Sequence, residues 1–281
     1  MVRALESISR YTCVSLLTLF VYGCVPTLDL KDFESVPLQQ PLRHETIAHR
    51  GSLHEGLPDN SIPALRESIS KGVQFLEVDV RQGSDGELFL FHDGSLQESN
   101  YASPRELLGE RVQELSTGDR GKVRLDAAGR IGIPTLRDAL STLDVSKTAA
   151  LQLDLKGESD QLLDAAVKLL IQEKKISRAV IQLKNPERIQ RIRSQEPRVR
   201  VLARVRDMEQ LEKAIAAKVE FIELERWITG EAVEKCHAAN ITVVLNIAAP
   251  RYDTKETWDF FRERGVDSIM TDHAVLANQG Q

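Results

Sequence analysis

Residues 75–92 read FLEVDVRQGSDGELFLFH, and this stretch decides the fold class of the chain. Two apolar runs with the two-residue alternation of β-strands, Phe75–Val80 and Leu88–His92, flank the dipeptide Asp85-Gly86. Asp-Gly between such runs is typical of a two-residue β-hairpin loop. The stretch therefore predicts two antiparallel neighbouring strands.

Seven further apolar or β-branched runs alternate with stretches of helical spacing, which is typical of parallel βα units. The predicted strands are Thr46–Ala48, Phe75–Val80, Leu88–His92, Ala150–Leu155, Ala179–Leu183, Val201–Val205, Phe221–Leu224, Thr242–Asn246 and Ser268–Thr271. A (β/α)8 barrel needs one strand fewer. The hairpin explains the surplus, because one of its strands departs from simple βα order. We therefore predict an α/β fold, a TIM-like (β/α)8 barrel with a small insertion after the third strand.

The predicted barrel domain covers residues 44–281, close to the roughly 250 residues of a typical barrel. Residues 94–134 are charged and glycine-dotted and fit the alternation poorly, so we predict that they form the insertion over one barrel mouth. Residues 25–43, with scattered prolines and no sustained periodicity, are predicted to be a tether.

Residues 1–24 are predicted to be a lipoprotein-type signal peptide. Their apolar run, 11–23, is shorter than the roughly 20 residues that span a bilayer and fits the roughly 7–15-residue core of an export signal. The ending Val21–Cys24 resembles a bacterial lipobox, in which the cysteine is lipidated. Valine rather than aspartate follows Cys24, which favours an outer membrane and an enzyme facing the periplasm. The alternative is an ordinary signal peptide or an uncleaved anchor with an incidental cysteine.

The composition favours a globular enzyme with a small-molecule substrate. The chain has 281 residues, of which 42% are hydrophobic and 28% charged, with a net charge of −5 and no basic block. Proteins that bind nucleic acid carry clustered basic residues, and this charge distribution does not indicate such a cluster. Cys236 is the only cysteine after Cys24, so the mature chain has no intramolecular disulfide framework, and we expect Cys236 to be a buried packing residue.

Glu77 and Asp79 are two positions apart on a predicted strand, so their side chains share one face. Two carboxylates that face the barrel interior repel each other unless a cation lies between them. Oxygen ligands without cysteine or clustered histidine favour Mg²⁺ or Ca²⁺ over Zn²⁺. The alternative is a solvated strand face.

His49-Arg50-Gly51 directly follows a predicted strand, where barrel enzymes carry their reactive loops. His49 can transfer protons near neutral pH, and the guanidinium of Arg50 suits a phosphate. Taken alone, the tripeptide is more typical of an exposed polar loop, and only its context favours a reactive loop.

His92 ends the second hairpin strand. If Asp85 and Gly86 are the two loop residues, Asp79 lies opposite His92, with their Cβ atoms about 5 Å apart. A longer turn that starts at Gly83 would shift this pairing.

Asp154 and Lys156 lie on one face of another alternating strand end, Leu151–Lys156. Asp154 offers a third carboxylate, and Lys156 could meet a phosphate oxygen or balance the acids. A purely structural lysine is the alternative.

Together these residues resemble the glycerophosphodiester phosphodiesterase family, whose pattern runs H-R-G, P-E-N-T, E-x-D and H-D. The corresponding segments here are His49–Gly51, Pro58–Ser61, Glu77–Asp79 and His92–Asp93, followed by Ile133–Leu136, Leu153–Lys156 and Gly265–Asp272. Order and spacing agree over roughly His44 to Leu276.

The resemblance implies a TIM-like barrel that hydrolyses glycerophosphodiesters to glycerol 3-phosphate and an alcohol. It implies a divalent cation held by Glu77, Asp79 and Asp154. In this family the glycerol hydroxyl beside the phosphate is thought to attack it, with two histidines, here His49 and His92, as acid and base. Arg50 and Lys156 would bind the substrate phosphate.

The sequence departs from the family pattern at three places. Pro58–Ser61 reads P-D-N-S instead of P-E-N-T, which keeps an acid and a hydroxyl. Asp154 stands where the family usually has glutamate, and Val244–Ile247 replaces a W-T-V-N segment, which removes an aromatic wall of the pocket. Head-group preference is therefore open. The alternatives are a lysophospholipase D-like activity on membrane lipids and a lipoprotein that binds phosphoesters without turning them over.

Overall fold

A computed structural model of the chain describes residues 45–52, 56–97, 104–157, 159–185, 187–224, 228–249 and 252–279. The predicted signal peptide with Cys24 and the predicted tether lie outside these residues. Within the described ranges, no helix is both long and apolar enough to cross a membrane.

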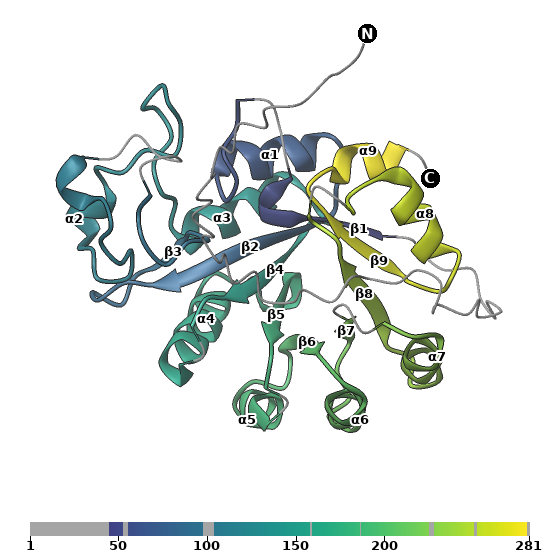
Figure 1. Cartoon of the computed structure of the whole chain (residues 1–281). Helices are drawn as coiled ribbons and strands as arrows, with labels where there is room; N and C mark the ends of the chain where they lie inside the picture. The colour runs from purple at the N-terminus through teal and green to yellow at the C-terminus, as the bar shows by residue number, and fades with distance from the viewer. Residues whose placement is uncertain are drawn as a thin grey trace, which may run out of the picture.

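Eight parallel strands form the predicted barrel (Figure 1). The barrel strands are β1 (Glu45–Ala48), β2 (Phe75–Gln82), β4 (Ala150–Leu155), β5 (Ala179–Leu183), β6 (Arg200–Val205), β7 (Phe221–Leu224), β8 (Thr242–Asn246) and β9 (Ser268–Thr271). They pair in the order β1-β9-β8-β7-β6-β5-β4-β2, and a β1–β2 pairing closes the ring. The carboxyl ends of these strands therefore meet at one mouth of the barrel.

The connections between the strands are largely helical, and side-chain oxygens cap several of these helices. The helices are α1 (Ile62–Ser70), α2 (Thr117–Arg120), α3 (Leu136–Thr142), α4 (Asp160–Gln172), α5 (Glu187–Gln195), α6 (Met208–Ala216), α7 (Gly230–Ala238), α8 (Lys255–Arg262) and α9 (Ala274–Gln279). Short 3₁₀ turns are η2 (His49–Gly51), η3 (Arg105–Leu107), η4 (Leu143–Val145) and η5 (Ile176–Arg178). The hydroxyl groups of Ser61, Thr135 and Thr229 accept hydrogen bonds from the first turns of α1, α3 and α7.

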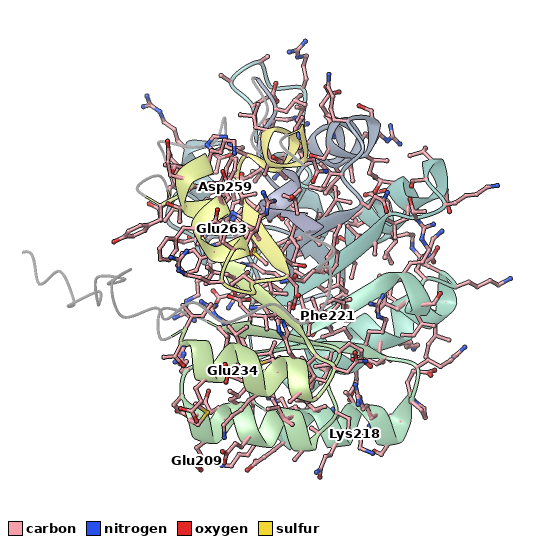
Figure 2. All side chains as sticks on the ribbon, turned by 90° about the vertical axis from the view of Figure 1, so that its right-hand side faces the viewer. Glu209, Lys218, Phe221, Glu234, Asp259 and Glu263 are labelled. Atoms are coloured by element: carbon pink, nitrogen blue, oxygen red, sulfur yellow. The ribbon has the colours of Figure 1, made fainter. Side chains whose placement is uncertain are left out.

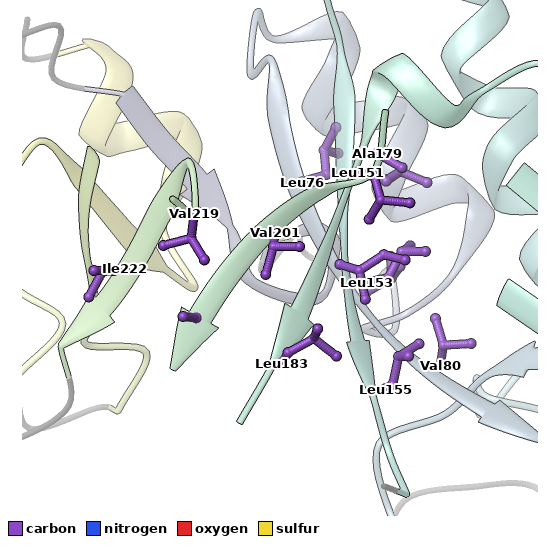
Figure 3. Close-up of a cluster of buried hydrophobic side chains, with 14 of the residues drawn as sticks. Leu76, Val80, Leu151, Leu153, Leu155, Ala179, Leu183, Val201, Val219 and Ile222 are labelled. Carbon is purple, nitrogen blue, oxygen red and sulfur yellow. The ribbon is translucent and has the colours of Figure 1, made fainter. Parts of the chain in front are cut away.

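The main core lies between the barrel and the helices, because alternate strand residues point outward onto the helices. Figure 3 shows part of this layer, including Leu76, Leu151 and Leu153, which are fully buried. Cys236 belongs to the same core, which confirms the predicted packing role, and burial raises the pKa of its thiol to about 12.

A second apolar layer fills the barrel interior towards the amino-terminal ends of the strands. It consists of Ile47, Phe75, Val180, Leu202, Phe221, Val244 and Met270. The rings of Phe75 and Phe221 lie 5.8 Å apart across it. Figure 2 shows Phe221 at the interior, whereas Glu209 and Glu234 lie on the outer surfaces of α6 and α7. Because this layer fills the amino-terminal end, polar inward-facing side chains are left at the carboxyl-terminal mouth.

The hairpin forms as predicted, but its register differs by one residue. β3 (Leu88–Leu90) runs antiparallel to β2, with Val80 opposite Leu90. The Gly83 amide donates to the Glu87 carbonyl, so the loop has three residues, and its last, Gly86, has a φ of +83°. This is the type I turn plus glycine bulge of three-residue hairpins. The predicted two-residue loop was therefore wrong.

The insertion, which contains α2, lies to one side of the barrel next to β3 (Figure 1). Its apolar side chains pack against the hairpin in a separate cluster, formed by Phe89, Phe91, Leu96, Leu107, Val112, Leu115, Val123 and Leu125. Arg120, only 4% exposed, pairs with Asp85 and Glu87 at 2.8 Å each and packs on the Phe89 ring. These contacts fasten the insertion to the hairpin.

Candidate active site

Three buried carboxylates converge at the barrel mouth. Glu77 and Asp79 lie on the inward face of β2, and Asp154 on β4 is the register partner of Asp79. Their exposed fractions are 2%, 1% and 7%, and one carboxylate oxygen of each lies within 4.8 Å of the others. The structure therefore brings together the three acids that were predicted as cation ligands.

Lys156 stands against this cluster. Its Nζ lies 2.7 Å from Asp79 Oδ1 and 2.5 Å from Asp154 Oδ2. Burial lowers the pKa of its ammonium, but the two carboxylates more than offset this and hold it above its ordinary value. Lys156 thus contacts the acids, while its predicted phosphate contact stays a prediction.

The two acids of β2 have opposite electrostatic surroundings. Burial, followed by the charges of Asp79 and Asp154, raises the pKa of Glu77 well above its ordinary value. For Asp79 burial is also the largest influence and raises the pKa, but Lys156 and Arg50 outweigh it and lower the pKa. Without a further cation, the surroundings therefore favour the protonated form of the Glu77 carboxyl group.

Arg50 frames the acids from the loop after β1. Its amide donates to Glu77 Oε2 at 2.9 Å, and its Nε lies 3.2 Å from Asp79 Oδ2. Its Nη1 donates to Asp59 at 3.0 Å. The loop turns sharply here, with a φ of +51° at Arg50. In this structure the guanidinium pairs with carboxylates, so its predicted phosphate contact remains untested.

Asn60 completes the surroundings of Asp79, although its sequence context suggested only a helix cap as an alternative to Ser61, and Ser61 is the residue that caps α1. Its Nδ2 donates to Asp79 Oδ2 at 2.7 Å, and its Oδ1 accepts from the Asp79 amide at 2.9 Å. Asn60 has a φ of +53°, a conformation that asparagine adopts more readily than most residues. The Pro58–Ser61 segment of the family pattern was the available signal for this residue.

His49 is held by Asp272 at the end of β9. Its Nδ1 lies 2.7 Å from Asp272 Oδ1, and its side chain is 14% exposed. Burial raises the pKa of Asp272, but the hydrogen bond and charge of His49 outweigh it and lower the pKa. Asp272 is a second residue that sequence analysis quoted without giving it a role.

A buried network fixes Asp272 in turn. Asp253 Oδ2 accepts the Asp272 amide at 2.8 Å, while Asp253 Oδ1 accepts from the Trp258 indole at 2.8 Å and from the Thr271 hydroxyl. Ser52 donates to the Asp272 carbonyl at 2.7 Å. The backbone of Asp272 is therefore held by Asp253, which Trp258 of α8 and Thr271 of β9 fix, and by Ser52 from the loop after β1.

His92 lies beside the end of β2, but not where it was predicted. The Phe91 amide donates to the Asp79 carbonyl at 3.0 Å, so Phe91 rather than His92 lies opposite Asp79. The Arg81 guanidinium binds the carbonyls of Phe91 and His92 at 3.0 and 2.6 Å. His92 Nδ1 lies 2.8 Å from Asp93, and its side chain is 38% exposed. The three-residue loop accounts for the one-residue shift.

The acidic cluster fits a hard divalent cation. Glu77, Asp79 and Asp154 offer only carboxylate oxygens, which Mg²⁺ and Ca²⁺ prefer. The raised pKa of Glu77 and the ammonium of Lys156 show that these buried negative charges need positive charge beside them. This geometry defines a class: a TIM barrel with a candidate cation site and an aspartate-held histidine at its mouth.

The chain belongs to the glycerophosphoryl diester phosphodiesterase family, whose pattern matches residues 49–276. Glycerophosphodiester phosphodiesterase 1 of Rattus norvegicus is 31% identical over 150 residues, which cover 50% of this chain and 44% of that protein. The probable glycerophosphodiester phosphodiesterase 2 of Mycobacterium tuberculosis is 33% identical over 126 residues, 44% of each chain. The matched segments thus span less than half the length of these relatives.

Solved structures share the fold. A putative glycerophosphodiester phosphodiesterase from Galdieria sulphuraria superposes with a TM-score of 0.73 at 20% identity, covering 85% of this chain and 99% of that one. An Oleispira antarctica phosphodiesterase, solved in complex with the product sn-glycerol-3-phosphate, gives 0.70 at 17% identity, covering 84% and 95%. At these identities the likeness concerns the fold alone.

Proposed function

We propose that this protein hydrolyses glycerophosphodiesters to glycerol 3-phosphate and an alcohol, with a divalent cation, Mg²⁺ or Ca²⁺. The observation that carries the proposal is the meeting, at one barrel mouth, of three buried acids with Lys156 and the His49–Asp272 pair. Family membership supports the substrate class, and so does the glycerol 3-phosphate bound to the Oleispira antarctica relative in fold.

Glu77, Asp79 and Asp154 are proposed to hold the cation. When bound, it would supply positive charge to the phosphoryl oxygens and so stabilise the charge that develops on them. Arg50 and Lys156 are proposed to orient the phosphate, since both are cationic groups at the edge of the acid cluster.

His49 is proposed as the general base. Because Asp272 accepts the proton on Nδ1, Nε2 is left unprotonated and able to accept one. Nε2 takes the proton of the glycerol hydroxyl beside the phosphate, whose oxygen then bonds to phosphorus. The bond from phosphorus to the alcohol oxygen breaks, and a cyclic glycerol phosphate is formed.

His92 is proposed as the general acid that protonates the departing alcohol oxygen. It is the more exposed histidine, at 38% against 14%, and so suits a group that leaves towards solvent. In the second step the roles reverse: His92 takes a proton from water, the water oxygen bonds to phosphorus, and His49 returns its proton to the glycerol oxygen. The net reaction is the hydrolysis of one diester by one water molecule, and both histidines return to their starting protonation states.

The test is an assay of the purified chain with glycerophosphoethanolamine and with a lysophospholipid, each with Mg²⁺, Ca²⁺ or a chelator. We expect cation-dependent release of glycerol 3-phosphate from the first substrate, and its loss in His49→Ala and Glu77→Ala. His237→Ala is the matched control, because His237 also pairs with an aspartate but at the amino-terminal end of β9. Absence of turnover with every cation would refute the proposal, and turnover of the lysophospholipid alone would favour the lysophospholipase D-like alternative.

We also propose that the enzyme is an exported lipoprotein anchored through Cys24, for which the lipobox-like ending Val21–Cys24 is the support. Labelling with a radioactive fatty acid in a bacterial host, followed by membrane fractionation, tests this. We expect label on the wild-type chain and none on Cys24→Ser. An unlabelled wild-type chain would exclude lipidation.

A further inference from the structure

Arg81 stands near the end of β2, two positions after Asp79 and therefore on the same face of the strand. Its Nε donates to the Phe91 carbonyl at 3.0 Å, and its Nη2 donates to the His92 carbonyl at 2.6 Å. Its Nη1 donates to Gln113 Oε1 at 3.2 Å. One guanidinium thus joins β2, the segment that carries His92, and the insertion.

His92 lies beyond the end of β3, where the ladder of β2 and β3 has ended. Its side chain is 38% exposed, and its Nδ1 contacts Asp93, the next residue of the same segment. A contact between chain neighbours moves with the segment and does not fix it against the barrel. The bond from Arg81, in contrast, ties the histidine's own carbonyl to the strand that carries Glu77 and Asp79.

The insertion holds the same segment from the other side. Phe91 is 2% exposed within the apolar cluster that the insertion forms with the hairpin. The Val112 amide donates to the Gly94 carbonyl at 3.1 Å, and the residue after Val112 is the Gln113 that accepts from Arg81. The segment is therefore fixed before and after the histidine by the insertion, and Arg81 fixes the histidine's own peptide.

The surroundings of Arg81 suit a fixed cation. Burial lowers the pKa of its guanidinium, while the charges of three aspartates, Asp79, Asp93 and Asp154, act in the opposite direction. An arginine side chain stays protonated in proteins, so its bonds to carbonyls are charge-assisted and stronger than those of a neutral donor. Because all three of its nitrogens donate to oxygens of the protein, Arg81 is placed to position its neighbours rather than to bind a phosphate.

We propose that Arg81 is a positioning residue that holds His92 in place for proton transfer to the departing alcohol, and that the insertion supports it through Gln113. This inference rests on the proposed function and adds the residue that orders the general acid. Without the guanidinium, the His92 segment loses its bond to β2. A misplacement of about 1 Å can cost about 10²-fold in rate.

Two substrates that differ in their leaving group test this role on the full chain with Mg²⁺ or Ca²⁺. Glycerophosphoethanolamine needs protonation of the departing alcohol, whereas a diester of glycerol 3-phosphate with p-nitrophenol does not. With the first substrate we expect Arg81→Met to lower kcat by at least about tenfold at unchanged KM, because a catalytic group is displaced and no substrate contact is lost. With the second we expect kcat within about twofold of the wild-type value.

A double-mutant cycle with His92→Ala ties the effect to that histidine. In the His92→Ala background, Arg81→Met should not lower the turnover of glycerophosphoethanolamine further, because the group that Arg81 positions is already gone. Arg178→Met is the matched control. Arg178 also binds backbone carbonyls, those of Leu143 and Ala149, but beside the amino-terminal end of β4. Its replacement should affect the two substrates equally.

Circular dichroism checks that each variant folds. Arg81→Lys keeps the charge but not the planar fork that binds two carbonyls at once, so it should show the same selective loss and replaces Arg81→Met if that variant fails to fold. An unchanged kcat, an equal loss with both substrates, or an effect that persists in the His92→Ala background would overturn the positioning role and leave the proposed function standing. Absence of turnover by the wild-type chain would overturn both.

Discussion

His49 Nδ1 lies 2.7 Å from Asp272 Oδ1, so the residue after the first strand of the barrel is held by the residue after its last strand. The pairing of β1 with β9 in register, with Ala48 opposite Thr271, makes these two positions neighbours. A carboxylate on Nδ1 fixes the tautomer and orientation of an imidazole and stabilises its protonated form. Closure of the barrel therefore builds the histidine-aspartate pair from opposite ends of the chain.

Asp272→Asn should lower kcat/KM by about 10²- to 10⁴-fold, because an amide can donate to Nδ1 and favour the wrong tautomer. Steady-state assays with glycerophosphoethanolamine measure the loss, and circular dichroism checks the fold. Asp267→Asn is the matched control, since it alters a histidine-aspartate pair at the other end of β9 and should leave kcat/KM near the wild-type value. Wild-type activity in Asp272→Asn would remove Asp272 from the mechanism.

A substrate whose leaving group needs no protonation should show which histidine is the general acid and which is the general base. A diester of glycerol 3-phosphate with p-nitrophenol releases an alcohol that leaves without protonation, so the general acid becomes dispensable. With this substrate, we expect the loss of kcat/KM in His92→Ala relative to wild type to become at least about 10²-fold smaller. This is the size of a general-acid contribution. His49→Ala should stay inactive. Recovery of His49→Ala instead would exchange the proposed roles.

Lys156→Met should tighten Mg²⁺ or Ca²⁺ binding, by about tenfold or more in the dissociation constant. The Lys156 ammonium lies 2.7 Å from Asp79 and 2.5 Å from Asp154, and so competes with a cation for these carboxylates. Calorimetry on chelator-treated protein measures the affinity, with Lys213→Met on the exposed face of α6 as a control that should bind the cation normally. Weaker binding in Lys156→Met would contradict this competition. The same variant should lose kcat/KM, because the proposed phosphate contact is removed.

The sequence predicted the strands and the acid cluster because both depend on local alternation. A strand places Glu77 and Asp79 on one face whatever its neighbours are, and parallel βα order brings the end of the next barrel strand, with Asp154, beside them. The barrel follows from the same alternation, once one strand of the hairpin is set aside.

Features that depend on exact loop geometry or on chain closure could not be predicted in this way. Loop length fixes hairpin register, and the glycine bulge at Gly86 moved Phe91 into the position predicted for His92. Asn60 reaches Asp79 only because its own backbone adopts a positive φ. The contact of Asp272 with His49 requires β1 and β9 to pair, which no local pattern encodes.

His237→Gln should destabilise the protein in a pH-dependent way. His237 Nε2 lies 3.1 Å from Asp267 Oδ2, and this hydrogen bond raises the pKa of His237 above its ordinary 6.5. The native state thus binds the proton more tightly, so the stabilisation is complete below the ordinary pKa and is lost as the pH rises through the raised one. For this partly exposed pair we expect a loss of about 1 kcal/mol or less near pH 6, shrinking towards about pH 9. Urea unfolding of both chains across this range measures it, and a difference that grows with pH would contradict the assigned pair.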